Sequence, residues 1–294
     1  MSRIFDALRK SEQEKTGKDS FTPWAKSARG NQVSKVRELS VPVPEADIRL
    51  VPRITPERHV LASGDNHSPG AEKFRVLRHR LQKIRSERPL RKLLVCSAVP
   101  REGKTLVAVN LAFSLAKTSQ HVLLIDADLR HSGVHEVLGL EAMPGLAELL
   151  ENKIDERTAT RRLAEPWSVH YIPAGHHSSA PGELLQGPRM AELLKQAGEK
   201  YEWVVVDSAP LSLFADTPHL ATLMDASLLV TRLSVTPATA IPNSLAALEG
   251  NFIAGIVMNG DADVVTSRYG YYYSISAAGD IEESTSVPDA TSKE

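Results

Sequence analysis

The chain has 294 residues, 42% of them hydrophobic, and a formal net charge of −1. This length allows one large or two small domains, and the near-neutral charge argues against nucleic acid as a partner. The only cysteine, Cys96, excludes a disulfide framework, favours a reducing compartment and is expected to lie in the core. Because we find no apolar run long enough to span a membrane and no signal peptide, we expect a soluble, intracellular protein.

The N-terminal region is predicted to be a short helix followed by a flexible arm. Residues 1–14 place Ile4, Phe5 and Leu8 on one side of a helix, which either docks to a partner or membrane surface or packs on its own domain. We hypothesise that this helix recruits the partner. Residues 15–68 are polar, contain scattered prolines and show no sustained period, which indicates a linker or disordered arm.

A strong helix is predicted from Pro69 to about residue 85. Its apolar stripe consists of Phe74, Leu77, Leu81 and Ile84. Between residues 72 and 92 there are nine Lys or Arg and only two Glu, which indicates a solvated basic face, an acidic partner surface or a nucleic-acid contact. The spacing of Glu72, Arg75 and Arg78 places these three charges on nearly one face.

Downstream, apolar runs alternate with helical patterns. Strands are expected near 92–97, 121–126, 168–173, 202–207, 226–232 and 252–258. Helices are expected near 103–118, 132–150 with an interruption at Pro144-Gly145, 181–200 with an interruption at Gly187-Pro188, 215–223 and 238–249. Because several strands are continuous apolar runs, we predict an α/β fold with a mostly parallel sheet and helices on both faces, as in a P-loop NTPase.

A phosphate-binding loop is predicted between the first of these strands and its helix. Gly103, Lys104 and Thr105 end this loop, although Ala98 stands where the strict pattern requires its first glycine. The Lys104 ammonium can reach the β- and γ-phosphates of a nucleotide, and the Thr105 hydroxyl can bind Mg²⁺. The alternative is that Gly103 merely opens a helix and that Lys104 is solvated.

Three aspartates follow apolar strands and are candidates for the chemistry. Asp207 is the natural carboxylate for Mg²⁺, directly or through water. Asp126 and Asp128 lie two apart, so on a strand both would point toward the neighbouring loop, where one can hold the water shell of Mg²⁺ and the other can accept a proton. A lone aspartate is often only a helix cap, but three beside a Gly-Lys-Thr indicate a site for nucleotide and Mg²⁺. Arg130 could pair with a carboxylate or a phosphate.

The C-terminal tail, residues 261–294, is rich in tyrosine and otherwise polar. It holds Tyr269, Tyr271, Tyr272 and Tyr273, four of the six tyrosines of the chain. Their phenols can enter a nucleotide site as acceptors, or they pack or are fortuitous. We therefore expect a P-loop domain over 69–260 between the arm and this tail.

These segments resemble the bacterial tyrosine kinases, the cytoplasmic kinases of exopolysaccharide and capsule synthesis. Residues 97–105, 123–130 and 204–210 resemble the Walker A, A′ and B motifs of that family, and 269–273 resembles its autophosphorylation tail. Glu72, Arg75 and Arg78 resemble its oligomerisation motif. Further similar segments are 171–175, 182–185 with Arg189-Met190, and 255–259, so the resemblance extends from about residue 69 to 273.

The resemblance implies ATP- and Mg²⁺-dependent autophosphorylation on tyrosine. Subunits would form a homo-oligomeric ring in which the tail of one enters the site of the next, and phosphorylation would loosen the ring. A membrane polysaccharide co-polymerase would be a separate activating chain that holds the kinase peripherally at the inner face of the membrane, and a cognate phosphatase would reverse the reaction.

The resemblance also assigns residue roles. Asp128 is the better candidate for the base, Lys104 is catalytic, and Asp126, Asp207 and Thr105 arrange Mg²⁺. The residues expected to contact the nucleotide are Pro100, Arg101, Glu102, Gly103, Lys104, Thr105, Leu106 and Asn259.

Two departures and two alternatives stand beside this interpretation. Arg101 occupies a position where the family commonly has Gly, and Ala180 replaces a common Asn. A spatial-organising ATPase of the MinD/ParA kind carries a second lysine where this chain has Val99, and a non-catalytic, nucleotide-gated scaffold of the export machinery is the other alternative. A kinase of the eukaryotic kind is excluded, because the sequence has neither His-Arg-Asp nor Asp-Phe-Gly.

Overall fold

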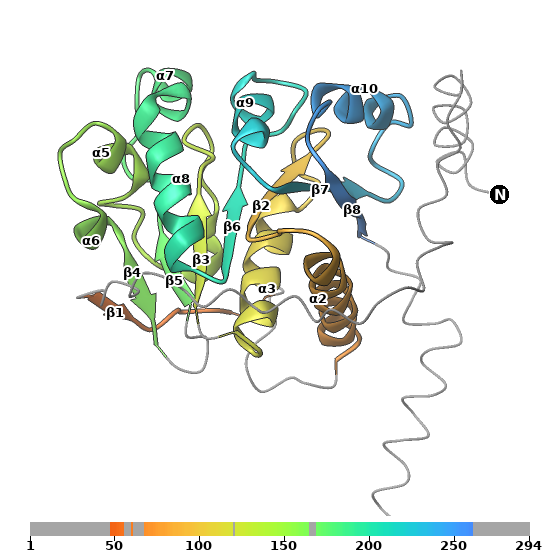
Figure 1. Ribbon diagram of the computed structural model, residues 1–294, viewed down its shortest axis with the longest axis horizontal. Helices are drawn as coiled ribbons and strands as arrows, with labels where there is room; N and C mark the ends of the chain where they lie inside the picture. Colours follow the sequence, from red (N-terminus) through yellow and green to blue (C-terminus); the bar gives the residue numbers. More distant parts are fainter. Residues whose placement is uncertain (1–47, 56–59, 61–67, 120, 165–168, 261–294) are drawn as a thin grey trace, which may run out of the picture. The chain divides into compact units, whose positions relative to one another are not determined.

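The computed structural model describes residues 48–55, 60, 68–119, 121–164 and 169–260. The predicted helix at 1–14 and the tyrosine cluster lie outside these residues. The described part contains an eight-stranded sheet with the order β1-β4-β5-β3-β6-β2-β7-β8 (Figure 1). Every pair of neighbouring strands is parallel except β4 and β5. The predicted fold class, a mostly parallel sheet between helices, is confirmed.

Strands and helices alternate along most of the chain. The strands are β1 (Ile48–Leu50), β2 (Lys92–Ser97), β3 (Val122–Asp126), β4 (Arg161–Leu163), β5 (Val169–Ile172), β6 (Trp203–Asp207), β7 (Ala226–Arg232) and β8 (Ile253–Asn259). The helices are α2 (Pro69–Glu87), α3 (Lys104–Ala116), α4 (Val134–Leu138), α5 (Leu146–Leu150), α6 (Glu156–Ala159), α7 (Pro181–Gln186), α8 (Pro188–Lys200), α9 (Asp216–Thr222) and α10 (Ala240–Ala247).

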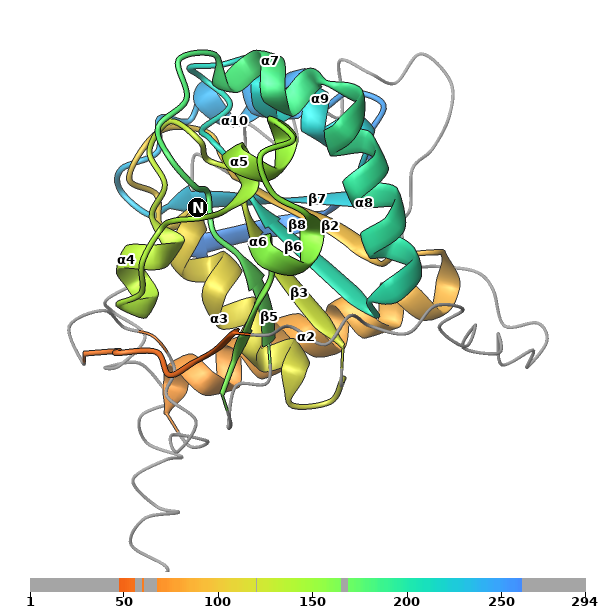
Figure 2. The same cartoon turned by 90° about the vertical axis from the view of Figure 1, so that its left-hand side faces the viewer.

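Helices cover both faces of the sheet, as Figure 2 shows, with α2, α3 and α4 on one face and α7, α8 and α9 on the other. Successive residues of a strand point to opposite faces. In β2, Leu93 and Val95 accordingly join the core under α2 and α3, while Leu94 and Cys96 join the core under α8 and α9. All four are fully buried, so the prediction that Cys96 is a core residue is confirmed.

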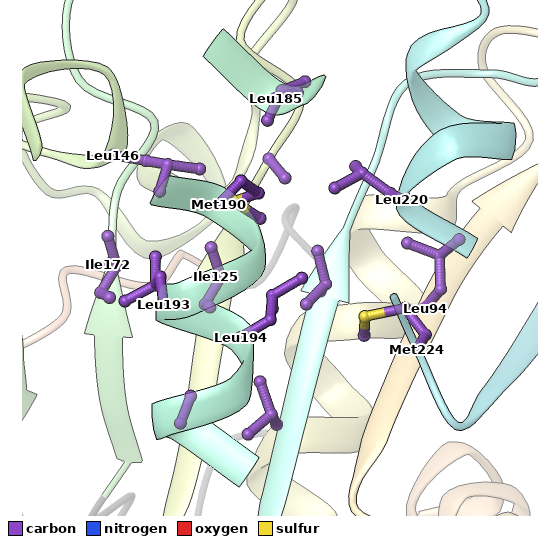
Figure 3. Close-up of a cluster of buried hydrophobic side chains, with 14 of the residues drawn as sticks. Leu94, Ile125, Leu146, Ile172, Leu185, Met190, Leu193, Leu194, Leu220 and Met224 are labelled. Atoms are coloured by element: carbon purple, nitrogen blue, oxygen red, sulfur yellow. The ribbon is translucent and has the colours of Figure 1, made fainter. Parts of the chain in front are cut away.

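The core under α8 and α9 consists mainly of leucine and isoleucine. Figure 3 shows Leu193 and Leu194 of α8 directed at the sheet, where Ile125 and Ile172 face them. These four side chains are at most 6% exposed. This packing fixes the positions of β3 and β5, and with them the polar residues that follow β3.

The predicted helix over 69–85 is confirmed and has clear local causes. Ser68 caps it through a 3.2 Å hydrogen bond that its hydroxyl accepts from the backbone N–H of Ala71, and Pro69 occupies the first turn. Leu81 is fully buried, and the other members of the predicted stripe pack against the same core.

Two expected helices are divided. The interruption predicted at Gly187-Pro188 separates α7 from α8. The interruption predicted at Pro144-Gly145 is also present but is longer, since 139–145 separate two five-residue helices, α4 and α5. Gly139 ends α4 in a left-handed conformation with φ +65°, which glycine adopts without steric cost.

The prediction of a linker or disordered arm over 15–68 is wrong for its last part. Residues Ile48–Leu50 form β1, which pairs in parallel with β4, itself antiparallel to β5. Neither strand was expected, because three residues are too few to show a period and β4 begins with two arginines. Within the described residues, no helix combines the length and the apolar character needed to cross a membrane.

Candidate active site

The loop between β2 and α3 wraps around the start of α3. Gly103 has a φ of +89°, and a Cβ at this position would overlap the side-chain amide of Asn259. Asn259 donates a 2.9 Å hydrogen bond to the carbonyl of Glu102. Only a glycine at position 103 therefore allows this close approach and the turn into the helix. The first N–H groups of the 13-residue α3 begin here, which is the usual geometry of an anion site.

Lys104 and Thr105 are directed at the carboxylates rather than at solvent. Lys104 Nζ lies 2.9 Å from Asp128 Oδ2 and 3.5 Å from Asp207 Oδ2. Thr105 donates a 2.7 Å hydrogen bond from its hydroxyl to Asp207 Oδ2. Burial alone would lower the pKa of Lys104, but Asp207 and Asp128 more than offset it, so this pKa is raised and the ammonium stays charged. The alternative of a solvated Lys104 is wrong, since the residue is only 9% exposed.

Two of the three aspartates end neighbouring strands, and the third, Asp128, follows just after one of them. Asp126 and Asp207 are partners in the register of β3 and β6, and the Ala127 N–H donates a 2.8 Å hydrogen bond to the Asp207 carbonyl just beyond. β3 ends at Asp126, so the expectation that Asp128 points the same way because it lies on the strand is wrong. Instead, the chain turns after Asp126, and this turn brings Asp128 to Lys104.

Backbone N–H groups hold Asp126 and Asp128 in place. Asp126 accepts 3.2 Å hydrogen bonds from the N–H of Asp128 at Oδ1 and from that of Val134 at Oδ2. Asp128 Oδ1 accepts a 3.0 Å hydrogen bond from the N–H of His131. Burial, and then the negative charge of Asp207, raise the pKa of Asp126. Burial likewise raises the pKa of Asp207, although Lys104 opposes the shift.

The residues at this site fit Mg²⁺ held together with phosphate. Asp207 Oδ1 is buried and accepts no hydrogen bond from the described residues, and Oδ2 of the same carboxylate contacts the Thr105 hydroxyl. Carboxylate and hydroxyl oxygens are the hard ligands that Mg²⁺ prefers, and it commonly uses only one or two carboxylates plus phosphates. Thr105 and Asp207 could therefore hold the ion directly, with Asp126 further back against α4.

The rest of the loop is braced by Glu102, one of the residues expected to contact the nucleotide, and by Thr236, which the sequence did not single out. Glu102 is fully buried and accepts hydrogen bonds from the Val99 N–H, at 2.8 Å, and from the Thr236 hydroxyl. Its carboxylate thus supports the loop rather than facing a ligand. Thr236 lies 134 residues away in the sequence, and no local pattern could have revealed this contact.

Relatives of this chain are protein kinases. The tyrosine-protein kinase YwqD of Bacillus subtilis is 32% identical over 219 residues, which are 74% of this chain and 92% of YwqD. The chain belongs to the bacterial tyrosine kinase family. The putative tyrosine-protein kinase AmsA of Erwinia amylovora is 31% identical over 225 residues, 76% of this chain but 31% of AmsA. The chain therefore spans about a third of the length of AmsA.

Solved structures agree with this assignment. The kinase domain of the Escherichia coli tyrosine kinase ETK superposes with a TM-score of 0.63 at 29% identity, over 72% of this chain and 89% of that domain. The septum site-determining protein MinD of Pyrococcus horikoshii, solved with Mg-ADP, shares the fold with a TM-score of 0.50 at 21% identity, over 59% of this chain and 71% of MinD. No family model matches the sequence.

Arg101 stands where the resemblance predicts a glycine. It has a φ of +65°, the left-handed region that favours glycine. Its carbonyl accepts a 3.3 Å hydrogen bond from the guanidinium of Arg232, the last residue of β7. The exposed Arg101 side chain therefore stands on a backbone that already has a glycine-like conformation.

Arg130 joins the segment after β3 to the segment after β6. Its Nε lies 2.8 Å from Asp216 Oδ2, and its guanidinium carbon lies 4.0 Å from the ring centroid of Phe214. The sequence allowed Arg130 to pair with a carboxylate or with a phosphate, and the structure shows a pair with a carboxylate, that of Asp216.

The three charged residues of α2 that resemble an oligomerisation motif, Glu72, Arg75 and Arg78, differ in their surroundings. Arg75 forms a 2.7 Å ion pair with Glu72 on the outer side of α2, where both side chains are well exposed. Arg78 instead donates a 2.6 Å hydrogen bond to the carbonyl of Ser114 on α3, and burial lowers the pKa of its guanidinium. Arg78 thus holds two helices of one chain together.

Proposed function

We propose that this chain is an ATP- and Mg²⁺-dependent protein-tyrosine kinase that phosphorylates its own C-terminal cluster, Tyr269, Tyr271, Tyr272 and Tyr273. The observation that carries the proposal is the contact of Lys104 with Asp128, 2.9 Å, beside the contact of Thr105 with Asp207, 2.7 Å. These contacts support a site beside the start of α3 in which Lys104 would bind phosphate, Asp128 would be the base, and Thr105 and Asp207 would bind the metal. The reaction that we propose for this site, phosphoryl transfer from ATP to tyrosine, is inferred from membership of the tyrosine kinase family.

In this proposal, Lys104 and the N–H groups at the start of α3 hold the terminal phosphates. Mg²⁺, when held by Thr105 and Asp207, would neutralise negative charge on those phosphates. Phosphate oxygens compete with Asp128 for Lys104, so nucleotide binding draws the ammonium away from that carboxylate. Asp128 then becomes free to accept the phenolic proton as the tyrosine oxygen bonds to the γ-phosphorus and ADP leaves.

We propose further that the kinase serves an exopolysaccharide system and works as a homo-oligomeric ring, with phosphorylation in trans. A membrane polysaccharide co-polymerase would activate it and hold it at the inner face of the membrane, and a cognate phosphatase would reset it. These proposals rest on the family, together with the exposed Glu72–Arg75 pair on α2.

The test is a phosphotyrosine blot and a phosphosite map of the purified full chain incubated with ATP and Mg²⁺. Lys104→Met removes the phosphate contact, and Lys153→Met, whose exposed ammonium pairs with Glu151 outside the site, is the matched control. We expect label on the tail tyrosines in the wild type and the control but not in Lys104→Met. ATP hydrolysis without label would instead favour a nucleotide switch of the MinD/ParA kind.

Phosphorylation in trans is tested by mixing two chains, neither of which can label its own tail. One carries Lys104→Met and an intact tail, and the other has an intact site and phenylalanine at all four tail tyrosines. We expect label on the Lys104→Met chain, because the other chain supplies the site. Absence of label in the mixture, with label in the wild type, would show a reaction within one chain.

A further inference from the structure

A segment that precedes the kinase motifs is built into the fold. Residues 49–54, here called the strap, continue from β1 across the edge of the core. The Leu50 carbonyl accepts a 2.8 Å hydrogen bond from the N–H of Ala164, Pro52 is buried, and Leu50 and Ile54 pack against the core under α3. The strap is therefore held at one end by the strand region of β4.

The other end of the strap is fastened to α4. The N–H of Arg53 donates a 2.9 Å hydrogen bond to the carbonyl of Leu138, the last residue of that helix. The next residue, Gly139, lies so close that a Cβ there would overlap the Arg53 carbonyl oxygen. In Figure 2 the orange-red strap runs just below α4.

The opposite end of α4 contacts the candidate metal site. The N–H of Val134, its first residue, donates a 3.2 Å hydrogen bond to Asp126 Oδ2. Gly133, just before it, faces Thr105, whose Cγ2 would lie 3.4 Å from a Cβ at that position. With five residues, α4 is only about 7 Å long. One short helix is thus hydrogen-bonded to the strap at one end and to Asp126 at the other.

Tight packing makes α4 a stiff connection. Val134 and Leu138 are both 0% exposed in the core under α3, and close-packed interiors transmit displacements rather than absorb them. From these contacts we infer that the strap is a positioning element, which holds α4 so that the Val134 N–H keeps Asp126 in place for Mg²⁺. The inference rests on the proposed function and adds to it a control point outside the kinase motifs.

Two glycines provide a matched pair of variants. Gly139 and Gly250 both have left-handed backbone, with φ of +65° and +87°, so Ala costs similar backbone strain at either. A Cβ at 139 meets the Arg53 carbonyl, whereas a Cβ at 250 meets nothing within 4 Å. Gly139→Ala therefore displaces the strap from α4, and Gly250→Ala reports the strain alone.

The first readout is hydrogen exchange of the full chain without nucleotide or metal. We expect Gly139→Ala to speed exchange in peptides that cover the strap and in those that cover 130–140, and Gly250→Ala to leave both at the wild-type rate. Fast exchange confined to the strap would overturn the inference, because α4 would then hold its position alone.

The second readout separates positioning from general stability. Two quantities are compared between variants. One is the Mg²⁺ concentration that gives half-maximal binding of a fluorescent ATP analogue, and the other is the affinity for the same analogue in EDTA, without Mg²⁺. Since losing an outer partner of a metal-binding carboxylate weakens metal binding 10- to 100-fold, we expect Gly139→Ala to raise the Mg²⁺ requirement about 3- to 10-fold while the affinity in EDTA stays within about twofold. An unchanged requirement would overturn the inference.

A second pair avoids the strain of alanine at a glycine position. Arg53→Pro removes the N–H that bonds Leu138, whereas Arg53→Ala keeps it, so only the proline variant should raise the Mg²⁺ requirement. Equal effects of the two would count against the contact. A wild-type chain that binds no Mg²⁺-nucleotide would instead refute the proposed function, and the exchange rates would still decide whether the strap holds α4.

Discussion

The hydroxyl of Thr105, in the first turn of α3, donates a 2.7 Å hydrogen bond to Oδ2 of Asp207, at the end of β6. The other oxygen of Asp207 is buried and has no hydrogen-bond partner among the described residues. Two oxygens from distant parts of the chain thus meet where β- and γ-phosphates would lie beside a phosphate-binding loop.

Thr105 provides a direct test of the metal site. Thr105→Val keeps the shape but removes the hydroxyl, so we expect the half-saturating Mg²⁺ concentration for nucleotide binding to rise about tenfold or more. Thr105→Ser retains the oxygen and should stay within about twofold of the wild type. Equal Mg²⁺ requirements for the two variants would remove Thr105 from the set of metal ligands.

Arg78 should contribute to the stability of the single chain. Its hydrogen bond to the Ser114 carbonyl joins α2 to α3, so Arg78→Ala is expected to lower the free energy of unfolding by about 1–2 kcal/mol in urea denaturation. Arg75→Ala, which breaks an exposed ion pair, should cost about 0.5 kcal/mol or less. If the two variants are equally stable, the α2–α3 contact does not carry the expected energy.

This difference matters for any study of the ring. A loss of oligomers in Arg78→Ala is ambiguous, because the fold itself is weakened. A loss of oligomers in Arg75→Ala at unchanged stability would report on the interface between subunits.

Arg101 should be replaceable by glycine. Its φ of +65° costs an L-residue about 1–2 kcal/mol, part of which glycine loses again through greater freedom in the unfolded chain. We expect Arg101→Gly to be more stable by about 0.5–1 kcal/mol than Arg101→Ala, which keeps the strain. Nucleotide affinity should be similar in both, since the loop already has a glycine-like backbone, and a large gain of affinity in the glycine variant would contradict this.

We predict that the free energy of unfolding decreases in acid because of His170. Burial first, and then Arg162 and His121, lower the pKa of this histidine to about 4. Between the ordinary value of 6.5 and about 4, the unfolded chain binds a proton that the folded chain does not. The free energy of unfolding should therefore fall as the pH drops through this window, by up to about 3 kcal/mol from this group.

The check is urea denaturation of the wild type and His170→Gln from pH 7.5 to pH 4. The variant starts less stable, because it loses the packing of the ring against Tyr201, but its slope with pH should be smaller. An identical slope would show that the imidazole is not the group that titrates.

Much of the site could be predicted because its signals are local. Buried parallel strands are continuous apolar runs, so β2, β3 and β6 stand out, and the polar residues at their ends mark the functional edge of the sheet. Gly103, Lys104, Asp126 and Asp207 follow from this logic. Asp128 was expected for a reason that failed, since the turn after Asp126 places it, not the strand.

The contacts that could not be predicted join residues far apart in sequence. Thr236 and Asn259 brace Glu102 from 134 and 157 residues away, and neither leaves a periodic trace. β1 and the strap were assigned to a linker because three-residue strands beside prolines lack any period, although Pro52 and Ile54 pack in the fold. Such contacts are set by the tertiary structure alone.

Asp128 gives the most direct test of the account. The measurement is the single-turnover rate of phosphoryl transfer from ATP to the tail tyrosines at saturating ATP and Mg²⁺, for Asp128→Asn and for Asp155→Asn. Asp155 caps the exposed end of α6, and asparagine caps as well as aspartate. We expect Asp128→Asn to slow transfer about 10²- to 10⁴-fold, with ATP bound as tightly or more tightly because Lys104 loses a competing partner, and the control to match the wild type. Transfer at the wild-type rate in Asp128→Asn would contradict the account.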